Sequence, residues 1–491
     1  MDAETLYTTL TRDSGIAAIQ AGAVERYVDS PITFWCDIHA PPDGQDSINL
    51  FQQHLFDTGH QHQTEVTGAQ FHGAVQEIFH TEEDGFRRTL KLMLAGETYL
   101  KDMPLLCRPM GVEGRPDILA RVDGLSSDLG SFSYQVFEIK SAKNIRESHI
   151  LQGALYNRLL GQVQGYEPEE YGLINRDHEL TTIRMAEVAD RLDQVLSEIR
   201  GVLAGADVDL CHGAARWPWE SFVNKKAIER NDVSLIPGVG VATRRNLCSS
   251  GYTTVADIAA TDEKALTQVD RVGVAIAKKF ISSAESIGLG LPVRRAPTPA
   301  IRRGVTDVFL DFEGTDPRVN ADGLEVVNYL IGALVRHPSH GPTYIPFFAP
   351  TFDAERAMLV EFFDWVPTLD DPVIYHWHHY ERIHLTKMAE HYEIDPAKAS
   401  YVIDRLVDLY PVTNKSFAFP TYGEGLKNIA RSLGFAWRQA DVTGLNSIAL
   451  YLTYVESSGS QDECREKIFV YNEDDCLATM HVFDWLLSQE E

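Results

Sequence analysis

One short stretch of the sequence combines charged residues with the pattern of a buried strand. In YQVFEIKSAK, strand alternation puts Glu138 and Lys140 on one face and Phe137 and Ile139 on the other. Asp117, in the preceding GRPD, adds a second carboxylate. Two carboxylates can hold Mg²⁺, and a nearby lysine can orient or deprotonate a water that attacks phosphorus. The set predicts metal-dependent phosphodiester chemistry; the alternative is an ion pair on a solvated strand face beside a turn aspartate.

A second acidic set joins residues that lie far apart in the chain. In VFLDFEG, alternation puts Asp311 and Glu313 on the same face as Phe309. Paired acids on a buried strand are costly unless they coordinate something. Tyr471 and Asp475, in VYNEDDCLATMHVFDWLL, are four residues apart and share a helix face. If the acids converge, two metal ions about 3.5 to 4 Å apart could stabilise the attacking and leaving oxygens. The alternative is a solvated acidic patch with Tyr471 in the core.

The first set is followed by an amphipathic helix. Gln152 and Tyr156 of HILQGALYNRLLG are four residues apart and share a face. The order GRPD, FEIK and QxxxY resembles the RecB-like branch of the PD-(D/E)XK nucleases. This resemblance implies that Asp117 and Glu138 bind metal and that Lys140 serves the attacking water. It also implies that Gln152 and Tyr156 contact DNA.

The upstream stretch LFDTGHQHQTEV resembles the first helical motif of the same family, which usually supplies a histidine or glutamate to the metal site. The resemblance implies this role for His62 or Glu65, and Gln63 stands where related sequences often carry an acid. Some members also hold an iron–sulfur cluster with one early and three late cysteines. Cys36 and Cys211 occupy suggestive places, but CHGAARWPW lacks the other two thiols, so we expect no such cluster.

The second acidic set carries its own resemblance. DxE followed far downstream by YxxxD resembles the DEDD exonucleases of the RNase H-like fold, in the branch where a tyrosine, here Tyr471, positions the attacking water. The further acid of that family follows a strand at the start of a helix, and PVIYHWHHYERIHL offers Glu381 there in place of an aspartate. Asp404 and Asp408 of YVIDRLVDLYP are alternative acids. Both families imply Mg²⁺ or Mn²⁺ as the cofactor.

The middle of the chain contains two similar glycine-helix units. LIPGVGVATRRNL has Gly238 and Gly240 before a helix, and VDRVGVAIAKKF has Gly273 in the corresponding place. Glycines allow backbone amides at a helix N-terminus to approach a phosphate. The block resembles a tandem helix-hairpin-helix domain, which implies sequence-independent DNA contacts; the alternative is a helical spacer that packs or binds protein. The basic residues expected along the DNA backbone are Arg244, Arg245, Lys278 and Lys279.

Bulk properties limit the kind of protein. At 491 residues the chain is expected to hold about three domains, at roughly 150 residues each. Its formal net charge of −27 argues against indiscriminate coating of nucleic acid, so any such contact must be local or involve metal. We expect neither a signal peptide nor a membrane span, and therefore a cytoplasmic protein.

We therefore predict a multidomain α/β chain. The expected parts are a restriction-endonuclease-like α/β/α core in a RecB-like domain (1–225), a small all-α tandem helix-hairpin-helix domain (230–288), a basic linker (289–303) and an RNase H-like α/β domain (304–491). The linker arginines, which we expect to add DNA contacts, are Arg294, Arg295, Arg302 and Arg303.

The predicted function is metal-dependent DNA hydrolysis, by an exonuclease or single-strand nuclease that acts on ends or single strands in repair, recombination or defence. Two alternatives remain open. One is a DNA-binding scaffold with one or both centres inactive, which recruits a helicase or another repair partner. The other is an RNA substrate, because neither site has a group that must read a 2′-hydroxyl.

Overall fold

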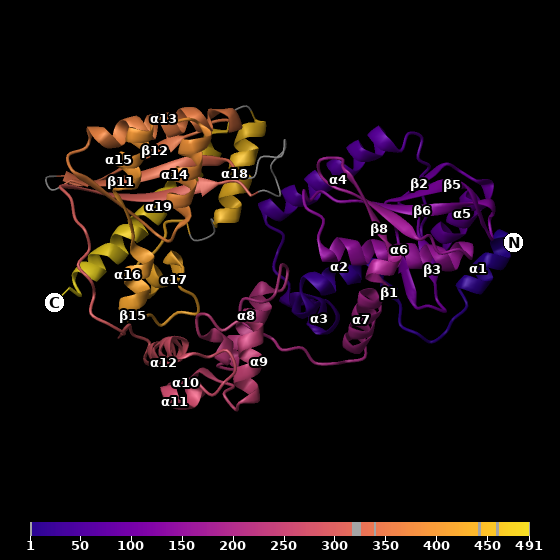
Figure 1. Cartoon of the computed structure of the whole chain (residues 1–491), viewed down its shortest axis with the longest axis horizontal. Coiled ribbons are helices and arrows are strands. Elements are labelled where there is room, and N and C mark those ends of the chain that lie inside the picture. The colour runs from indigo at the N-terminus through magenta and orange to yellow at the C-terminus, as the bar shows by residue number, and fades with distance from the viewer. Residues whose placement is uncertain (1, 317–325, 338–339, 440–442, 458–460, 491) are drawn as a thin grey trace. The chain divides into compact units, whose positions relative to one another are not determined.

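The computed structural model describes residues 2–316, 326–337, 340–439, 443–457 and 461–490. The chain divides into two compact units, which are described separately (Figure 1). The first comprises Met1–Ser47, Leu55–Leu210 and Ala214–Val223, and the second comprises Ile48–His54, Cys211–Gly213 and Asn224–Glu491. Within the described ranges, no helix has both the length and the apolar character needed to cross a bilayer.

The first unit mixes helices with short and long strands. Its helices are α1 (Ala3–Leu10), α2 (Ala21–Asp29), α3 (Pro31–His39), α4 (Leu50–Gln70, which begins in the second unit), α5 (Glu82–Ala95), α6 (Glu147–Gln164) and α7 (Met185–Leu203). Its strands are β1 (Ile19–Gln20), β2 (Tyr99–Lys101), β3 (Leu105–Cys107), β4 (Val112–Gly114), β5 (Ile118–Ser127), β6 (Gly130–Ile139), β7 (Glu170–Ile174) and β8 (Leu180–Arg184).

A mixed five-stranded sheet, ordered β2-β5-β6-β7-β8, is the centre of the first unit. Only β6 and β7 pair in parallel, and the long helix α6 connects them. One face packs Tyr134 and Val136 against α6, and the other packs Ile139 with Val66 of α4. This alternation along β6 directs the side chains of the predicted strand as the sequence indicates. A smaller sheet, β1-β4-β3, accompanies it.

The second unit begins with a helical block and continues into an α/β region. The helical block contains α8 (Glu220–Glu229, shared with the first unit), α9 (Val241–Ser249), α10 (Val255–Ala259), α11 (Glu263–Leu266) and α12 (Val274–Leu289). The strands are β9 (Val293–Arg294), β10 (Thr306–Gly314), β11 (Asn328–His337), β12 (His340–Phe348), β13 (Pro372–His376), β14 (Leu406–Asp408) and β15 (Phe417–Ala418). The later helices are α13 (Glu355–Trp365), α14 (Tyr380–His391), α15 (Pro396–Ile403), α16 (Leu409–Ser416), α17 (Leu426–Ser432), α18 (Gly444–Glu456) and α19 (Asp462–Leu487).

The α/β region is a five-stranded sheet, ordered β12-β11-β10-β13-β14, with helices on both faces (Figure 1). Strands β10, β11 and β12 are antiparallel neighbours, whereas β13 is parallel to both β10 and β14. Along β10, Leu310 packs into a core with Phe362 of α13, and Phe309 packs on the opposite face with Phe483 of α19. Asp311 and Glu313 have the parity of Phe309, so they face α19.

The segment predicted as a basic linker, residues 289–303, pairs in part with the α/β region. Val293 and Arg294 form β9, which pairs antiparallel with β15. The Arg295 guanidinium donates to Ser282 Oγ at 2.8 Å and to the Asn414 carbonyl at 2.7 Å, and Arg294 lies 4.9 Å from the Phe417 ring centroid. Pairing of β9 with β15 holds the segment in place, so both arginines contact residues of the second unit. The Arg295 guanidinium is thus bound within the unit, whereas Arg294 is exposed and its contact with DNA stays a prediction.

Candidate functional site

The three side chains of the first predicted set meet beside the ends of β5 and β6. Lys140 Nζ lies 3.4 Å from Glu138 Oε2, and Glu138 Oε1 accepts the Asp117 backbone N–H at 3.0 Å. Asp117 Oδ2 accepts the Ile139 backbone N–H at 2.6 Å. The antiparallel register of β5 and β6 pairs Ile118 with Phe137, so it sets Asp117 next to Glu138. Local strand pairing thus brings the three side chains together.

Burial governs the charges of this set. It raises the pKa of Asp117 to about 6, although Lys140 opposes the shift. Burial and then the Asp117 charge raise the pKa of Glu138 to about 8. Burial alone would lower the pKa of Lys140, but Glu138, Glu25 and Asp117 together raise it above its ordinary value. At neutral pH the lysine is therefore charged, Asp117 is mostly ionised, and Glu138 mostly keeps its proton unless a metal cation binds.

Two further side chains complete this set, and neither was predicted there. Gln63 Nε2 donates to Asp117 Oδ1 at 2.9 Å and to Asp102 Oδ1 at 3.0 Å. Glu25 Oε2, from α2, lies 3.4 Å from Lys140 Nζ. A sequence signal existed for Gln63, which stands at a position that is often acidic in related sequences. Glu25 is 115 residues from Lys140, and we found no local pattern that links them.

Helix α6 brings both of its predicted residues next to the same set of side chains. Gln152 Oε1 accepts a hydrogen bond from Lys140 Nζ, and the Gln152 side chain is buried. Tyr156 is also buried, and the charges of Glu138 and Asp117 help to raise the pKa of its hydroxyl after burial itself. Tyr156 lines a cavity of about 260 Å³ together with Arg115. The structure therefore gives Gln152 a contact with Lys140, while its predicted contact with DNA stays a prediction.

His62 and Glu65 have a different place from the one that the resemblance implies. Residues three apart on a helix share a face, whereas consecutive residues are turned by about 100°. The phase of α4 therefore directs Gln63 to Asp117, and it directs His62 and Glu65 to His178. The expectation that His62 or Glu65 joins the Asp117 and Glu138 carboxylates is corrected by this helical phase. His178 was not singled out from the sequence.

The second predicted set gathers three carboxylates from β10 and α19. One oxygen each from Asp311, Glu313 and Asp475 lie within 4.8 Å of one another. Burial, then Asp475 and Glu313, raises the pKa of Asp311 well above its ordinary value. Burial and then Asp475 raise the pKa of Glu313 to about 8, and burial also raises the pKa of Asp475. Such a group of buried oxygens suits Mg²⁺ or Mn²⁺, which would neutralise the acids on binding.

Polar neighbours orient each of these three carboxylates. Asn472 Nδ2 donates to Asp311 Oδ2 at 2.8 Å, and Trp437 Nε1 donates to Asp475 Oδ1 at 2.6 Å. The Tyr329 hydroxyl donates to Glu313 Oε2 at 3.4 Å. Fixed hydrogen-bond donors of this kind hold the oxygens of a metal site in place. Asn472, Trp437 and Tyr329 were not predicted, because no spacing rule connects them with the acids.

Tyr471 reaches the same cluster from one turn before Asp475. Burial, followed by the charges of Glu313 and Asp475, raises the pKa of its hydroxyl, which is therefore protonated at neutral pH. Lys427 Nζ donates to this hydroxyl, and the ammonium lies 4.3 Å from the Tyr471 ring centroid. Lys427 belongs to the helix in YGEGLKNIARSLG, although the residue itself was not predicted. The hydroxyl is thus held by a cation beside three acids.

The remaining acids differ in their surroundings. Glu381 is buried, and its Oε2 lies 3.2 Å from His376 Nδ1. Its charge contributes to the raised pKa of Asp311, but its oxygens are not among those that lie within 4.8 Å of one another. Asp408 Oδ1 accepts the backbone N–H groups of His378 and Tyr410, each at 2.9 Å. Asp404 is exposed at the end of α15. Neither alternative acid therefore has a described contact with the cluster.

The predicted glycines of the helical block stand at helix starts. Gly240 is the N-cap of α9 and Gly273 is the N-cap of α12, and a Cβ at either position would meet open space. Gly238 has a φ of +95°, a backbone conformation that favours glycine. Two helix N-termini are thus accessible, as phosphate contacts by backbone amides require.

The basic residues of this block are not equivalent. Arg244 is buried and donates from Nη2 to Asp232 Oδ2 at 2.7 Å, so its predicted contact with the DNA backbone is corrected. Its position on the inner face of α9 makes it a structural ion pair. Lys279 Nζ lies 2.8 Å from Glu424, and Lys278 Nζ lies 3.8 Å from Glu263. Lys278 and Arg245 lie on the surface.

Comparison with known families identifies two of these regions. Residues 308–487 match the RNase_H superfamily, and residues 231–286 match the SAM-like Helix-hairpin-helix tandem. No curated protein matches the chain. The predicted multidomain α/β class, with a helix-hairpin-helix domain and an RNase H-like domain, is confirmed. The carboxylate cluster of Asp311, Glu313 and Asp475 lies inside the RNase H-like match.

Proposed function

We propose that this protein is a metal-dependent nuclease that hydrolyses phosphodiester bonds in DNA, at ends or in single strands. One observation carries the proposal: three carboxylates with raised pKa values, two of them buried and one partly buried, converge within a domain of the RNase_H superfamily. A tandem helix-hairpin-helix domain on the same chain supports a nucleic-acid substrate. Roles in repair, recombination or defence, with a helicase as a partner, belong to the same proposal.

At the second cluster, Asp311, Glu313 and Asp475 would hold Mg²⁺ or Mn²⁺, in the manner of a DEDD exonuclease. When bound, the metal stabilises negative charge on the scissile phosphate and its attacking and leaving oxygens. Tyr471 keeps its proton and orients the attacking water through its hydroxyl, and Lys427 fixes that hydroxyl. Asn472 and Trp437 keep two of the carboxylates turned toward the shared space.

At the first cluster, we infer a second centre of the RecB-like PD-(D/E)XK type. Asp117 and Glu138 would hold the metal, and Lys140, charged at neutral pH, would position the attacking water. Glu25 and Gln152 hold the ammonium of Lys140, which limits where that water can bind. The proposed domains are 1–225 for this centre, 230–288 for the helix-hairpin-helix block and 304–491 for the RNase H-like part.

The helix-hairpin-helix block would bind the DNA backbone rather than read bases. The N-termini of α9 and α12, with Gly240 and Gly273, present backbone amides that suit phosphate oxygens. Exposed Arg245 and Lys278 would add charge beside them. Contacts of this kind give affinity without sequence preference, and the affinity decreases with salt.

A scaffold with an inactive C-terminal centre is the second candidate, and the Glu381 contact favours it. Glu381 binds His376 instead of joining the three gathered carboxylates. If a further acid is required there, the second centre would bind DNA without cutting it. The intact arrangement of Asp117, Glu138 and Lys140 argues against inactivity of the whole chain.

The test is cleavage of end-labelled single-stranded DNA, double-stranded DNA and RNA of matched sequence, with Mg²⁺, Mn²⁺ or EDTA. We expect metal-dependent cleavage of DNA by the wild type. Loss of that cleavage in Asp311→Ala, but not in Lys140→Ala, assigns it to the second centre, and the reverse pattern assigns it to the first. Binding without cleavage under any metal would contradict the enzyme and support the scaffold.

A further inference from the structure

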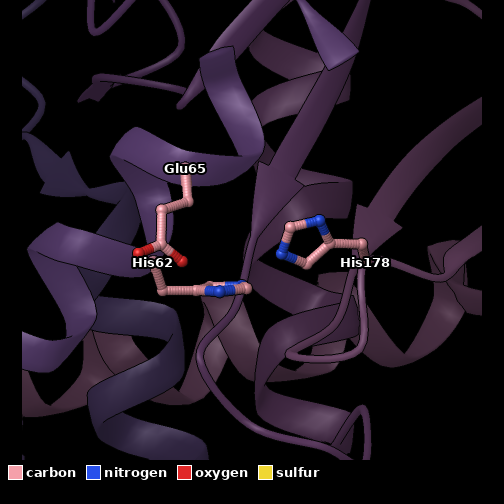
Figure 2. Close-up of side chains that lie close together, drawn as sticks. All are labelled: His62, Glu65 and His178. Atoms are coloured by element: carbon pink, nitrogen blue, oxygen red, sulfur yellow. The ribbon is translucent and has the colours of Figure 1, made fainter. Parts of the chain in front are cut away.

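Two histidines and a glutamate gather in the first unit, outside the Asp117 and Glu138 set. His62 and Glu65 lie on α4, and His178 lies in the loop between β7 and β8. One ligand atom from each of the three lies within 4.8 Å of the others. Figure 2 shows the Glu65 carboxylate and the His62 ring extending from the helix, with the His178 ring facing them from the loop. None of the functions proposed above uses this group.

His62 has an unsatisfied nitrogen at this position. Its side chain is buried, with only 8% of the residue exposed, and Nε2 has no hydrogen-bond partner among the described residues. In a neutral histidine, an N–H on Nδ1 leaves a lone pair on Nε2. This is the tautomer in which metal-binding histidines are commonly held, with the second nitrogen bonded to a backbone carbonyl.

The ring of His62 is neutral under ordinary conditions. Burial lowers the pKa of His62, and the neighbouring His178 lowers it further. A buried Nε2 without a partner is costly, and a bound cation would satisfy it.

The other two ligands are held by their own local contacts. Glu65 accepts a hydrogen bond from Gln61 Nε2 at 2.8 Å. The loop that carries His178 is closed by Asn175 Oδ1, which accepts the N–H groups of Asp177 at 3.0 Å and Glu179 at 2.9 Å. Gln70 Nε2, from the end of α4, donates to the His178 carbonyl at 3.1 Å. The helix and the loop are therefore already joined beside the three side chains.

We propose that His62, Glu65 and His178 bind a divalent cation of the zinc type, separately from the two carboxylate centres. Two imidazoles and one carboxylate suit Zn²⁺ and related transition metals, whereas Mg²⁺ prefers oxygen ligands alone. Three protein ligands leave one tetrahedral position for water or another ligand. The chemistry thus differs from that of the Asp311, Glu313 and Asp475 cluster.

The cation also fixes the helix that serves the first centre. Gln63, which donates to Asp117, directly follows His62 in α4. A metal that joins α4 to the loop after β7 restricts rotation of this helix, so it stabilises the position of Gln63. Zinc occupancy is therefore expected to raise the thermal stability of the whole chain, because the cation binds only the folded arrangement of these three residues.

The test uses the full chain, stripped of metal and titrated with Zn²⁺ against a chromophoric chelator. Excess Mg²⁺ is present to occupy the carboxylate centres, and Co²⁺ replaces Zn²⁺ in a parallel titration followed by visible absorption. We expect stoichiometric binding by the wild type, with the Co²⁺ spectrum of a mixed nitrogen and oxygen site. Glu65→Ala and His178→Ala should each weaken binding at least about 100-fold, the upper limit for loss of a mere supporting group.

Matched controls distinguish this site from adventitious binding. His60→Ala removes an exposed histidine of the same helix that is outside the group, and it should leave zinc affinity unchanged. Asp311→Asn and Glu138→Gln should do the same. Both test variants change exposed residues, so their folding is checked by circular dichroism. Failure of the wild type to bind zinc, equal affinity in His178→Ala, or loss of zinc in Asp311→Asn would each overturn the proposal.

Discussion

The two acidic clusters balance their charge in different ways. In the first, Lys140 Nζ lies 3.4 Å from both Glu138 and Glu25, so a cation is already part of the carboxylate group. In the second, Lys427 Nζ donates to the Tyr471 hydroxyl, and from there its charge opposes the rise in the pKa values of the three carboxylates. A proposed water is therefore oriented by an ammonium at the first cluster and by a neutral hydroxyl at the second. Similar carboxylates thus lie in two different electrostatic surroundings.

This difference predicts unequal dependence on metal. A buried ion pair offsets part of the cost of burying the first carboxylates. The pKa values of Asp311, Glu313 and Asp475 are raised first by burial, and repulsion from neighbouring carboxylates adds to the shifts of Asp311 and Glu313. We therefore expect loss of a ligand at the second cluster to have the larger effect.

Asp311→Asn is the substitution with the largest expected effect. It removes a charged ligand and keeps the size of the side chain, so the chain should fold while metal-dependent cleavage at the second centre decreases about 10³-fold. That factor corresponds to roughly 4 kcal/mol, within the range that a catalytic metal supplies. Single-turnover cleavage at saturating Mn²⁺ measures it. Asp364→Asn, an exposed acid of α13, is the control and should retain wild-type rates. Equal rates in both variants would remove the second centre from the mechanism.

Lys140→Ala should have the next largest effect, and only at the first centre. Loss of a group that orients or deprotonates water is expected to lower that activity by about 10²-fold or more. The same change leaves Glu138 and Glu25 without their cation, so both should ionise at higher pH than in the wild type. Rates on separate single-stranded and double-stranded substrates measure the selectivity. If Lys140→Ala and Asp311→Asn abolish the same cleavage event, the two clusters act in one reaction rather than as separate centres.

The local parts of both clusters could be predicted, because strand and helix periodicity depend on neighbouring residues. Alternation placed Glu138 with Lys140 and Asp311 with Glu313, and helical spacing placed Tyr471 with Asp475. The prediction was wrong about which face of α4 points to the first cluster. Gln63 contacts Asp117, whereas the adjacent His62 lies with Glu65 and His178. A 100° step changes the partner completely, and the amphipathic pattern of α4 was too weak to fix that phase.

Contacts between distant segments could not be predicted. Glu25 approaches Lys140 because α2 packs beside α6. A single sequence does not show which helices pack together, so it does not show which charged residues this packing buries. Arg244 illustrates the reverse error, because its basic character suggested DNA while helix packing turned it toward Asp232. Gly332 is a third case: its pairing opposite Asp311 depends on the register between β10 and β11.

Gly332→Ala tests how closely the second cluster is packed. A Cβ at Gly332 would lie within 1.6 Å of Asn472 Oδ1, so the alanine must displace the amide that binds Asp311. Loss of a hydrogen bond to a charged group costs about 1.5 kcal/mol or more, so we expect a decrease of about 10-fold in the rate. Asn472→Ala should give a similar decrease by itself.

The double variant separates displacement of Asn472 from a general disturbance of the sheet. If Gly332 acts through Asn472, adding Gly332→Ala to Asn472→Ala should cost little more, because the clash is already removed. Additive losses in the double-mutant cycle would instead show that the alanine disturbs β10 and β11 independently of Asn472.

The smallest expected effect is the pH dependence of metal-free stability, to which both clusters contribute. Glu138 and Glu313 each have a pKa of about 8 in the folded chain, above the ordinary value of 4.5. The folded state therefore binds more protons than the unfolded state between these values, so this contribution to stability is fully present below the ordinary pKa and decreases as pH rises toward 8. Thermal unfolding in EDTA should show a falling midpoint from pH 5 to about pH 8 relative to Glu138→Gln and Glu313→Gln, which lack these titrations.

Mn²⁺ should restore stability mainly at the higher pH, because only deprotonated carboxylates bind it. A larger Mn²⁺ effect in Glu138→Gln than in Glu313→Gln would support the stronger metal dependence of the second cluster, and the opposite order would reverse the comparison.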